Sequence, residues 1–320
     1  MRQLIIAMIL ASTALAQNTS KPSLDDQLTN VGRMLQAGRT SDAERLLRQA
    51  VPKPEDEPAE PAGIFSATGL HDILWALTGH YYLGANDYAN ANRVSAERLR
   101  AAEAKGAAGA GHLPIYLLLM AEVFRLQGKH AEAYPLYVRL NQLWIRNQLS
   151  ADFQKRTALG YVECLIVRGD ASTAETVARP AVDTDGSETG PSFHEDYFNT
   201  YAVAMDEAGH KAQAAQFEAK IDAGSRRPPA ANQQDRDLFR ARLANARGQD
   251  FAAESIYQKW IAYWKTAKSP PGFDPKEFLQ IRMAALVGYS HFLAVRGRTR
   301  EAQAIQAQLT AAGCRAGTCE

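Results

Sequence analysis

The chain has 320 residues, with 36 lysines and arginines against 35 aspartates and glutamates, and 46% of its residues are hydrophobic. This near balance of charge argues against nucleic acid or an anionic membrane surface as the main partner, because both attract a basic excess.

Residues 1–16 have the three parts of an export signal. Arg2 supplies the positive start, Leu4 to Leu10 form a short apolar core, and Ala14-Leu15-Ala16 forms a small-residue cleavage site before Gln17. The apolar run is shorter than the about 20 residues that a spanning helix needs. We therefore expect cleavage near Ala16, a soluble periplasmic or secreted product, and no transmembrane segment in the mature chain.

Helical periodicity follows, from about residue 24 to residue 312, with apolar residues at spacings of three and four. Seven glycines interrupt it, and each has an alanine five residues later. The pairs are Gly38/Ala43, Gly84/Ala89, Gly128/Ala133, Gly169/Ala174, Gly209/Ala214, Gly248/Ala253 and Gly297/Ala302. Glycine costs a helix about 1 kcal/mol relative to alanine and readily adopts the left-handed conformation that ends a helix. Each glycine therefore predicts the turn of a helical hairpin, and each alanine allows the paired helices to approach closely.

This pattern resembles the tetratricopeptide repeat family, in which a turn residue is followed five positions later by alanine. Another small residue of the family, seven positions before the turn, is present as Ala121, Ala202, Ala241 and Ser290, whereas Val31, Leu77 and Val162 depart from it. The resemblance implies an all-α fold, a right-handed superhelical α-solenoid of about seven helix-turn-helix repeats over residues 24–312. A flexible N-terminus over residues 17–23 would precede it.

The cysteines and one loop add smaller expectations. Cys314 and Cys319 enclose four residues that include Gly317, and in an oxidising compartment this spacing favours a local disulfide in a tail over residues 313–320. Cys164 lies in an apolar run, where a small buried thiol is the usual state. The acidic, proline-rich segment 52–63 is expected to be a mobile loop.

Motifs of catalysis and metal binding are missing from the sequence. It contains no His-Glu-x-x-His, no Gly-x-Ser-x-Gly and no phosphate-binding Gly-x4-Gly-Lys-Ser/Thr. The run His194-Glu195-Asp196 favours a solvated helix start over a metal site, because consecutive residues point around a helix rather than to one face. We expect no catalytic residue, no metal and no cofactor. Helical spacing also predicts a buried inner face for four residues, Tyr257, Trp260, Ile261 and Trp264.

In the tetratricopeptide family, ligand-contacting side chains lie six and three residues before the turn glycine, on the first helices that line the concave face. Carried over by position, they give the candidates for a partner-binding groove: Thr78, Tyr81, Glu122, Arg125, Glu163, Asp206, Arg242, Asn245 and His291. Their mixed charges suit an extended peptide or a partner helix. Ordinary solvated helix faces, tied by pairs such as Glu122/Arg125, are the alternative interpretation.

The leading hypothesis is therefore a non-catalytic scaffold of the cell envelope or periplasm that binds a protein or an extended peptide. A second hypothesis is a helical-repeat enzyme or small-molecule receptor that acts on envelope glycans. It requires Glu122 and Glu163 to converge with one of their pKa values raised. Self-association through the terminal hairpins is a third possibility.

Overall fold

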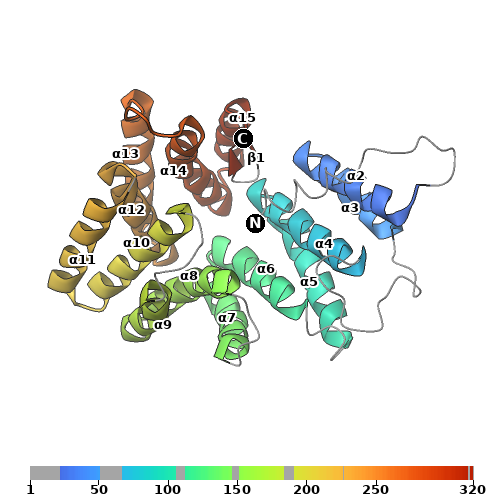
Figure 1. The fold of residues 1–320 in the computed structure, drawn as a ribbon, viewed down its shortest axis with the longest axis horizontal. Helices are drawn as coiled ribbons and strands as arrows, with labels where there is room; N and C mark the ends of the chain where they lie inside the picture. The colour runs from blue at the N-terminus through green and yellow to red at the C-terminus, as the bar shows by residue number, and fades with distance from the viewer. Residues whose placement is uncertain are drawn as a thin grey trace. The chain divides into compact units, whose positions relative to one another are not determined.

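The computed structural model describes residues 22–50, 67–105, 112–145, 151–183, 191–225, 227–315 and 318–319. The expected signal segment 1–16 and the loop 52–63 lie outside the described residues, as does most of segment 17–23. The described residues form fourteen α-helices and one pair of two-residue strands (Figure 1). The all-α expectation is confirmed.

The helices come in pairs joined by short turns. The pairs are α2 (Leu24–Gln36) and α3 (Thr40–Gln49), α4 (Ala67–Gly84) and α5 (Tyr88–Ala104), α6 (Leu113–Leu126) and α7 (His130–Ile145), α8 (Ala151–Val167) and α9 (Ala171–Asp183), α10 (Pro191–Glu207) and α11 (Lys211–Gly224), α12 (Pro229–Ala246) and α13 (Asp250–Thr266), and α14 (Pro275–Val295) and α15 (Thr299–Ala311). The chain divides into two compact units, Met1–Met120 and Ala121–Glu320, with the division inside α6.

First helices pack on first helices within each unit. In the first unit α2 contacts α4, and in the second α8, α10, α12 and α14 contact one another in succession. In the second unit α8 also contacts α12, past the helix α10 that separates them in sequence. Inner side chains of alternate hairpins can therefore meet.

The seven turns share one backbone geometry. The second residue after each first helix has a positive φ, and its N–H and the next N–H donate back to carbonyls of that helix. At the third turn Gly128 N donates to Arg125 O and Lys129 N to Phe124 O, both at 2.9 Å. This is the Schellman arrangement, which supplies partners for carbonyls left open at a helix end. The left-handed residues are Gly38, Asn86, Gly128, Gly169, Gly209, Gly248 and Gly297.

The second turn differs from the sequence prediction. Gly84 is the last residue of α4, and Asn86, with φ of 60°, takes the left-handed position. Asparagine tolerates this conformation better than most non-glycine residues because its short side chain can hydrogen-bond locally. The alanine five residues after Asn86 is Ala91, which is fully buried, whereas the predicted Ala89 is exposed. The turn position of this hairpin therefore lies two residues later than expected.

With that correction, the alanine five residues after the turn is buried in every hairpin. These residues are Ala43, Ala91, Ala133, Ala174, Ala214, Ala253 and Ala302. The small residue seven positions before the second turn becomes Gly79 in place of Leu77. A Cβ atom added to Gly79 would lie 2.6 Å from a methyl carbon of Leu119, so a larger residue would force the Leu119 side chain to shift where α4 and α6 pack closely.

Large side chains of second helices fit against glycines of the following first helices. Tyr137 and Tyr257 each lie nine residues after their turn glycine, and they pack against Gly160 and Gly288 respectively. A Cβ atom at Gly288 would lie 2.7 Å from Cε1 of Tyr257. The expected inner face of α13 is confirmed, since Tyr257, Trp260 and Trp264 are buried and Ile261 packs against the same core.

One helix bears on the expectation of no transmembrane segment in the mature chain, which stays a prediction. By length and composition alone α14 could cross a membrane. It is also a core helix of the second unit, where Phe278, Ile281 and Phe292 are buried and the helix contacts α12, α13 and α15.

The cysteines occupy two different settings. Cys164 is a buried free thiol, as expected, and burial raises its pKa. Cys314 and Cys319 face each other in the antiparallel pair β1 (Cys314–Arg315) and β2 (Thr318–Cys319). The Cys319 side chain lies outside the described residues, so the disulfide stays a prediction.

The corrected turn predicts opposite outcomes for two neighbouring alanines. Ala91→Leu should lower the free energy of unfolding by about 1–3 kcal/mol, because it overpacks a filled contact. Ala89→Leu, on an exposed face, should change it by less than about 0.5 kcal/mol. Urea unfolding followed by circular dichroism measures both. A larger loss for Ala89→Leu would place the turn back at Gly84.

Candidate functional site

Four side chains of the second unit form a row of alternating charge, here called the charge row: Glu122 and Arg125 of α6, Glu163 of α8 and Arg242 of α12. Arg125 donates to both carboxylate oxygens of Glu122, from Nε at 3.1 Å and from Nη2 at 2.6 Å. Its Nη1 donates to Oε2 of Glu163 at 2.8 Å, and Nε of Arg242 donates to the same oxygen at 3.0 Å. Four of the nine predicted candidates therefore contact one another.

The turns explain how these residues meet. Glu122, Glu163 and Arg242 each lie six residues before a turn glycine, so the hairpins present them on equivalent sides of their first helices. In the hairpin of α10 and α11, which comes between those of Glu163 and Arg242, the same position holds Val203, which is buried. Because α8 contacts α12, Glu163 reaches Arg242 although 79 residues separate them.

Two further side chains hold the carboxylates of the charge row. Nε2 of His130 lies 3.1 Å from Oε1 of Glu163, and its Nδ1 lies 3.1 Å from the Gly128 carbonyl oxygen. The hydroxyl of Tyr137 donates to Glu122. Arg242 is the most exposed of the four side chains at 37%, against 19% for Glu122, 12% for Arg125 and 3% for Glu163.

The charge row keeps both of its carboxyl groups ionised. Burial acts to raise the pKa of Glu163, but the charges of Arg125 and Arg242 outweigh it and hold this pKa well below the usual range. Burial opposes ionisation of Glu122 in the same way, and Arg125 and the Tyr137 hydroxyl lower its pKa below 4.5. A general acid needs a raised carboxyl pKa, and neither glutamate has one.

Two more side chains lie within electrostatic reach of the charge row. Burial lowers the pKa of His291 to about 4, with help from the Arg125 charge, so this imidazole is neutral at pH 7. Burial raises the pKa of Tyr257 to about 12, against the opposing influence of the Arg242 charge. The candidate His291 thus lies within the electrostatic influence of Arg125.

The remaining candidates are placed elsewhere. Thr78 has no exposed surface, and its hydroxyl donates to the Leu74 carbonyl of its own helix at 2.8 Å, so it offers nothing to a partner. The shift of the turn to Asn86 explains this difference. Tyr81 is half-buried, and Asp206 is 3.3 Å from Nη2 of Arg240. Within the described residues, Oδ1 of Asn245 is buried without a hydrogen bond.

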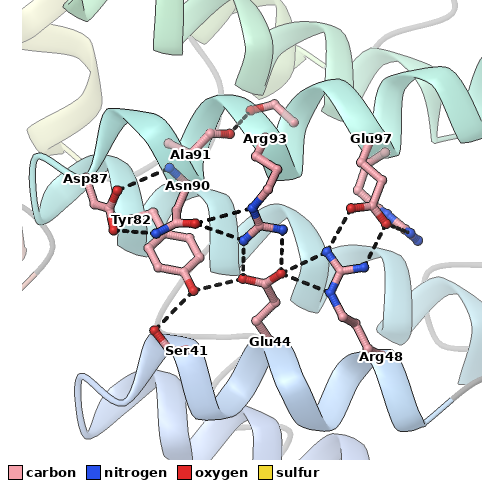
Figure 2. A network of polar contacts seen from close by, with 11 residues as sticks. Ser41, Glu44, Arg48, Tyr82, Asp87, Asn90, Ala91, Arg93 and Glu97 are labelled. Atoms are coloured by element: carbon pink, nitrogen blue, oxygen red, sulfur yellow. Dashed lines mark hydrogen bonds and ion pairs between the residues drawn. The ribbon is translucent and has the colours of Figure 1, made fainter.

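A second set of charges, in the first unit, lies outside the candidates predicted from the sequence. Glu44 of α3 accepts from both Nη atoms of Arg93 at 2.7 Å, from Arg48 and from the Tyr82 hydroxyl at 2.8 Å (Figure 2). Burial opposes ionisation of Glu44, and hydrogen bonds from Arg93 and Arg48 lower its pKa to about 2. Figure 2 shows Arg48 also reaching Glu97, so this network ties α3 to α4 and α5.

A signal for such links was present in the sequence. Glu44, Glu175 and Glu254 each directly follow a buried turn alanine, and each bonds a residue four positions later, Arg48, Arg179 or Gln258. Glu175 and Glu254 also bind the residue directly after the next turn glycine: His210 at 2.8 Å and Arg298 at 2.9 Å. The recurring Ala-Glu-x-x-x-Arg/Gln therefore marks links between successive hairpins.

Comparisons with known proteins add no family. Neither a scan against protein-family models nor a search of curated proteins gives a match to this chain. Among the described residues, no group of three or more histidine, cysteine, aspartate or glutamate side chains is placed to hold a metal ion.

The Glu44 network predicts an acid-dependent loss of stability. Because the folded-state pKa of Glu44 is about 2 against an ordinary 4.5, its contribution is complete above about pH 4.5 and is lost as the pH falls toward 2. Glu44→Gln should therefore be less stable than wild type at pH 6, with a difference that shrinks toward pH 2. Urea unfolding across this pH range measures it.

Asp42→Asn is the matched control. Asp42 lies on the same helix in an exposed pair with Arg45, and exposed pairs contribute about 0–1 kcal/mol. A stability difference between wild type and Glu44→Gln that stays constant from pH 6 to 2 would contradict the ionised network.

Proposed function

We propose that the chain is a non-catalytic tetratricopeptide-like scaffold that binds a protein or peptide, with the inner side chains of its first helices in contact with the partner. The observation that carries this proposal is the recurrence of one Schellman turn and one buried alanine in all seven described hairpins. Stacked hairpins hold their side chains in place before binding, so a partner is bound without a large ordering cost. A right-handed superhelix of about seven such repeats is part of the proposal.

The charge row supports binding over acid-base chemistry. Glu122 and Glu163 converge on Arg125, as the glycan-enzyme hypothesis requires, but the pKa of each is lowered rather than raised. An inverting or retaining glycosidase of the usual kind needs one carboxyl that stays protonated near neutral pH. The second candidate function, an enzyme or receptor for envelope glycans, would therefore need residues other than Glu122 and Glu163.

The place of action is proposed from residues 1–16 alone. Their charge, apolar core and Ala-x-Ala site support export to the periplasm or beyond the cell. A disulfide between Cys314 and Cys319 fits the same oxidising compartment.

The best variant for testing partner binding is at Arg242. Removing Arg125 would leave the buried Glu122 and Glu163 without their shared cation, at a cost of about 3–5 kcal/mol, and would confound binding with stability. Arg242 is more exposed, and Glu163 keeps Arg125 and His130 when Arg242 is changed.

Arg242→Gln should weaken partner binding by about tenfold, which corresponds to about 1.4 kcal/mol. Tagged mature protein would capture partners from an envelope extract, and each protein identified would be purified and titrated against both forms. Arg247→Gln, which breaks an exposed pair with Glu207, is the matched control and should bind like wild type. Equal affinity of wild type and Arg242→Gln, with the fold intact by circular dichroism, would remove the charge row from the binding surface.

A further inference from the structure

Two hairpins of the second unit share a tyrosine nine residues after the turn and differ in charge six residues before it. In α6 and α7, Glu122 lies six residues before the turn and Tyr137 nine residues after it. The Glu122 carboxylate accepts from Tyr137 and from Arg125. In α12 and α13 the same two positions hold Arg242 and Tyr257. The second hairpin therefore keeps the tyrosine but has an arginine where the first has the carboxylate that accepts from it.

The tyrosine is fixed in place with its hydroxyl unused. Tyr257 is 3% exposed, and its ring lies 5.9 Å from the ring centroids of Tyr289 and Phe292. Gly288 leaves room for the ring, as Gly160 does for Tyr137. No hydrogen bond joins the Tyr257 hydroxyl to any residue that the structure describes, whereas the equivalent Tyr137 hydroxyl binds Glu122.

The arginine is held at one edge only. Nε of Arg242 donates to Glu163, and the guanidinium carbon lies 5.0 Å from the centroid of the Phe239 ring. Its two Nη groups make no hydrogen bond to the described part of the chain, and 37% of the side chain is exposed. The charge row thus runs negative, positive, negative, positive and ends on an accessible cation.

We propose that Arg242 and Tyr257 bind a carboxylate from outside the chain, in the way that Arg125 and Tyr137 hold Glu122. A planar carboxylate fits the Nη edge of a guanidinium and accepts from a hydroxyl at the same time. A carboxylate on the Nη edge would continue the alternation of charge along the row. This inference deepens the proposed function, on which it rests, since the carboxylate then belongs to the partner.

The carboxylate has two possible sources, an acidic group of a protein partner or a free small acid. Both offer the same chemistry to Arg242 and Tyr257. The probes are therefore sodium acetate, N-acetyl-glutamate methylamide as a mimic of an acidic side chain, and N-acetyl-glutamine methylamide as its uncharged match.

The experiment titrates these probes into the mature chain with its arginine Nε labelled with ¹⁵N. Both carboxylate probes should shift the Arg242 Nε–H resonance, which is assigned by its loss in Arg242→Gln, with saturation. The glutamine probe should not shift it. Tyr257→Phe should weaken binding by about tenfold, since it removes a hydrogen bond to a charged group.

Tyr82→Phe is the matched control, because it deletes a hydroxyl whose acceptor, Glu44, is built into the chain and lies outside the charge row. Its affinity for the probes should stay within about twofold of wild type, because neither residue takes part in the proposed site. The inference is overturned if no probe shifts the resonance, if the glutamine probe binds as well as the glutamate probe, or if Tyr257→Phe binds like wild type.

The two proposals fail in different ways. If both carboxylate probes bind through Arg242 and Tyr257 but no purified partner does, the carboxylate site stands as a site for small acids and the scaffold function fails. If a partner binds in an Arg242-dependent way while the probes do not, the scaffold function stands and the carboxylate site fails.

Discussion

The left-handed residue at each hairpin turn sets the phase of the two helices that it joins. The Schellman hydrogen bonds fix where the first helix ends. They therefore also fix which side chain, six residues before the turn residue, lies on the inner side of the first helix. The alanine five residues after the turn residue is fixed in the same way against the first helix. A shift of two residues would rotate every side chain by about 200° around the helix axis. Exposed Ala89 beside buried Ala91 shows how sharply this phase is set.

Within the second unit, this phase brings ionisable groups to one place, where they must neutralise each other. Glu163 is buried and would be costly as a lone charge, yet Arg125, Arg242 and His130 all face its two oxygens. The consequence is a row whose buried members are satisfied and whose accessible end is a cation. Function is therefore expected at that end rather than at the buried glutamates.

The sequence was sufficient for the local structure and for part of the site. Glycine marked six of the seven turns, and counting from them identified Glu122, Arg125, Glu163 and Arg242, which the structure brings together. It misplaced Thr78, because Gly84 and Asn86 both suit a helix end and only the backbone decides between them. It also could not give the contact of α8 with α12, since that depends on how three hairpins pack. The sequence indicated the Glu44 network only through a repeated Ala-Glu pair, because residues that bind these glutamates lie on other hairpins.

The most direct test of this arrangement is a double-mutant cycle on Glu163 and Arg242, the pair that joins alternate hairpins. The free energies of unfolding of wild type, Glu163→Gln, Arg242→Gln and the double variant would be measured in urea at pH 7. A coupling energy above about 0.5 kcal/mol is expected for residues in direct contact. Additive effects would contradict the contact, and with it the convergence of inner side chains that the site requires.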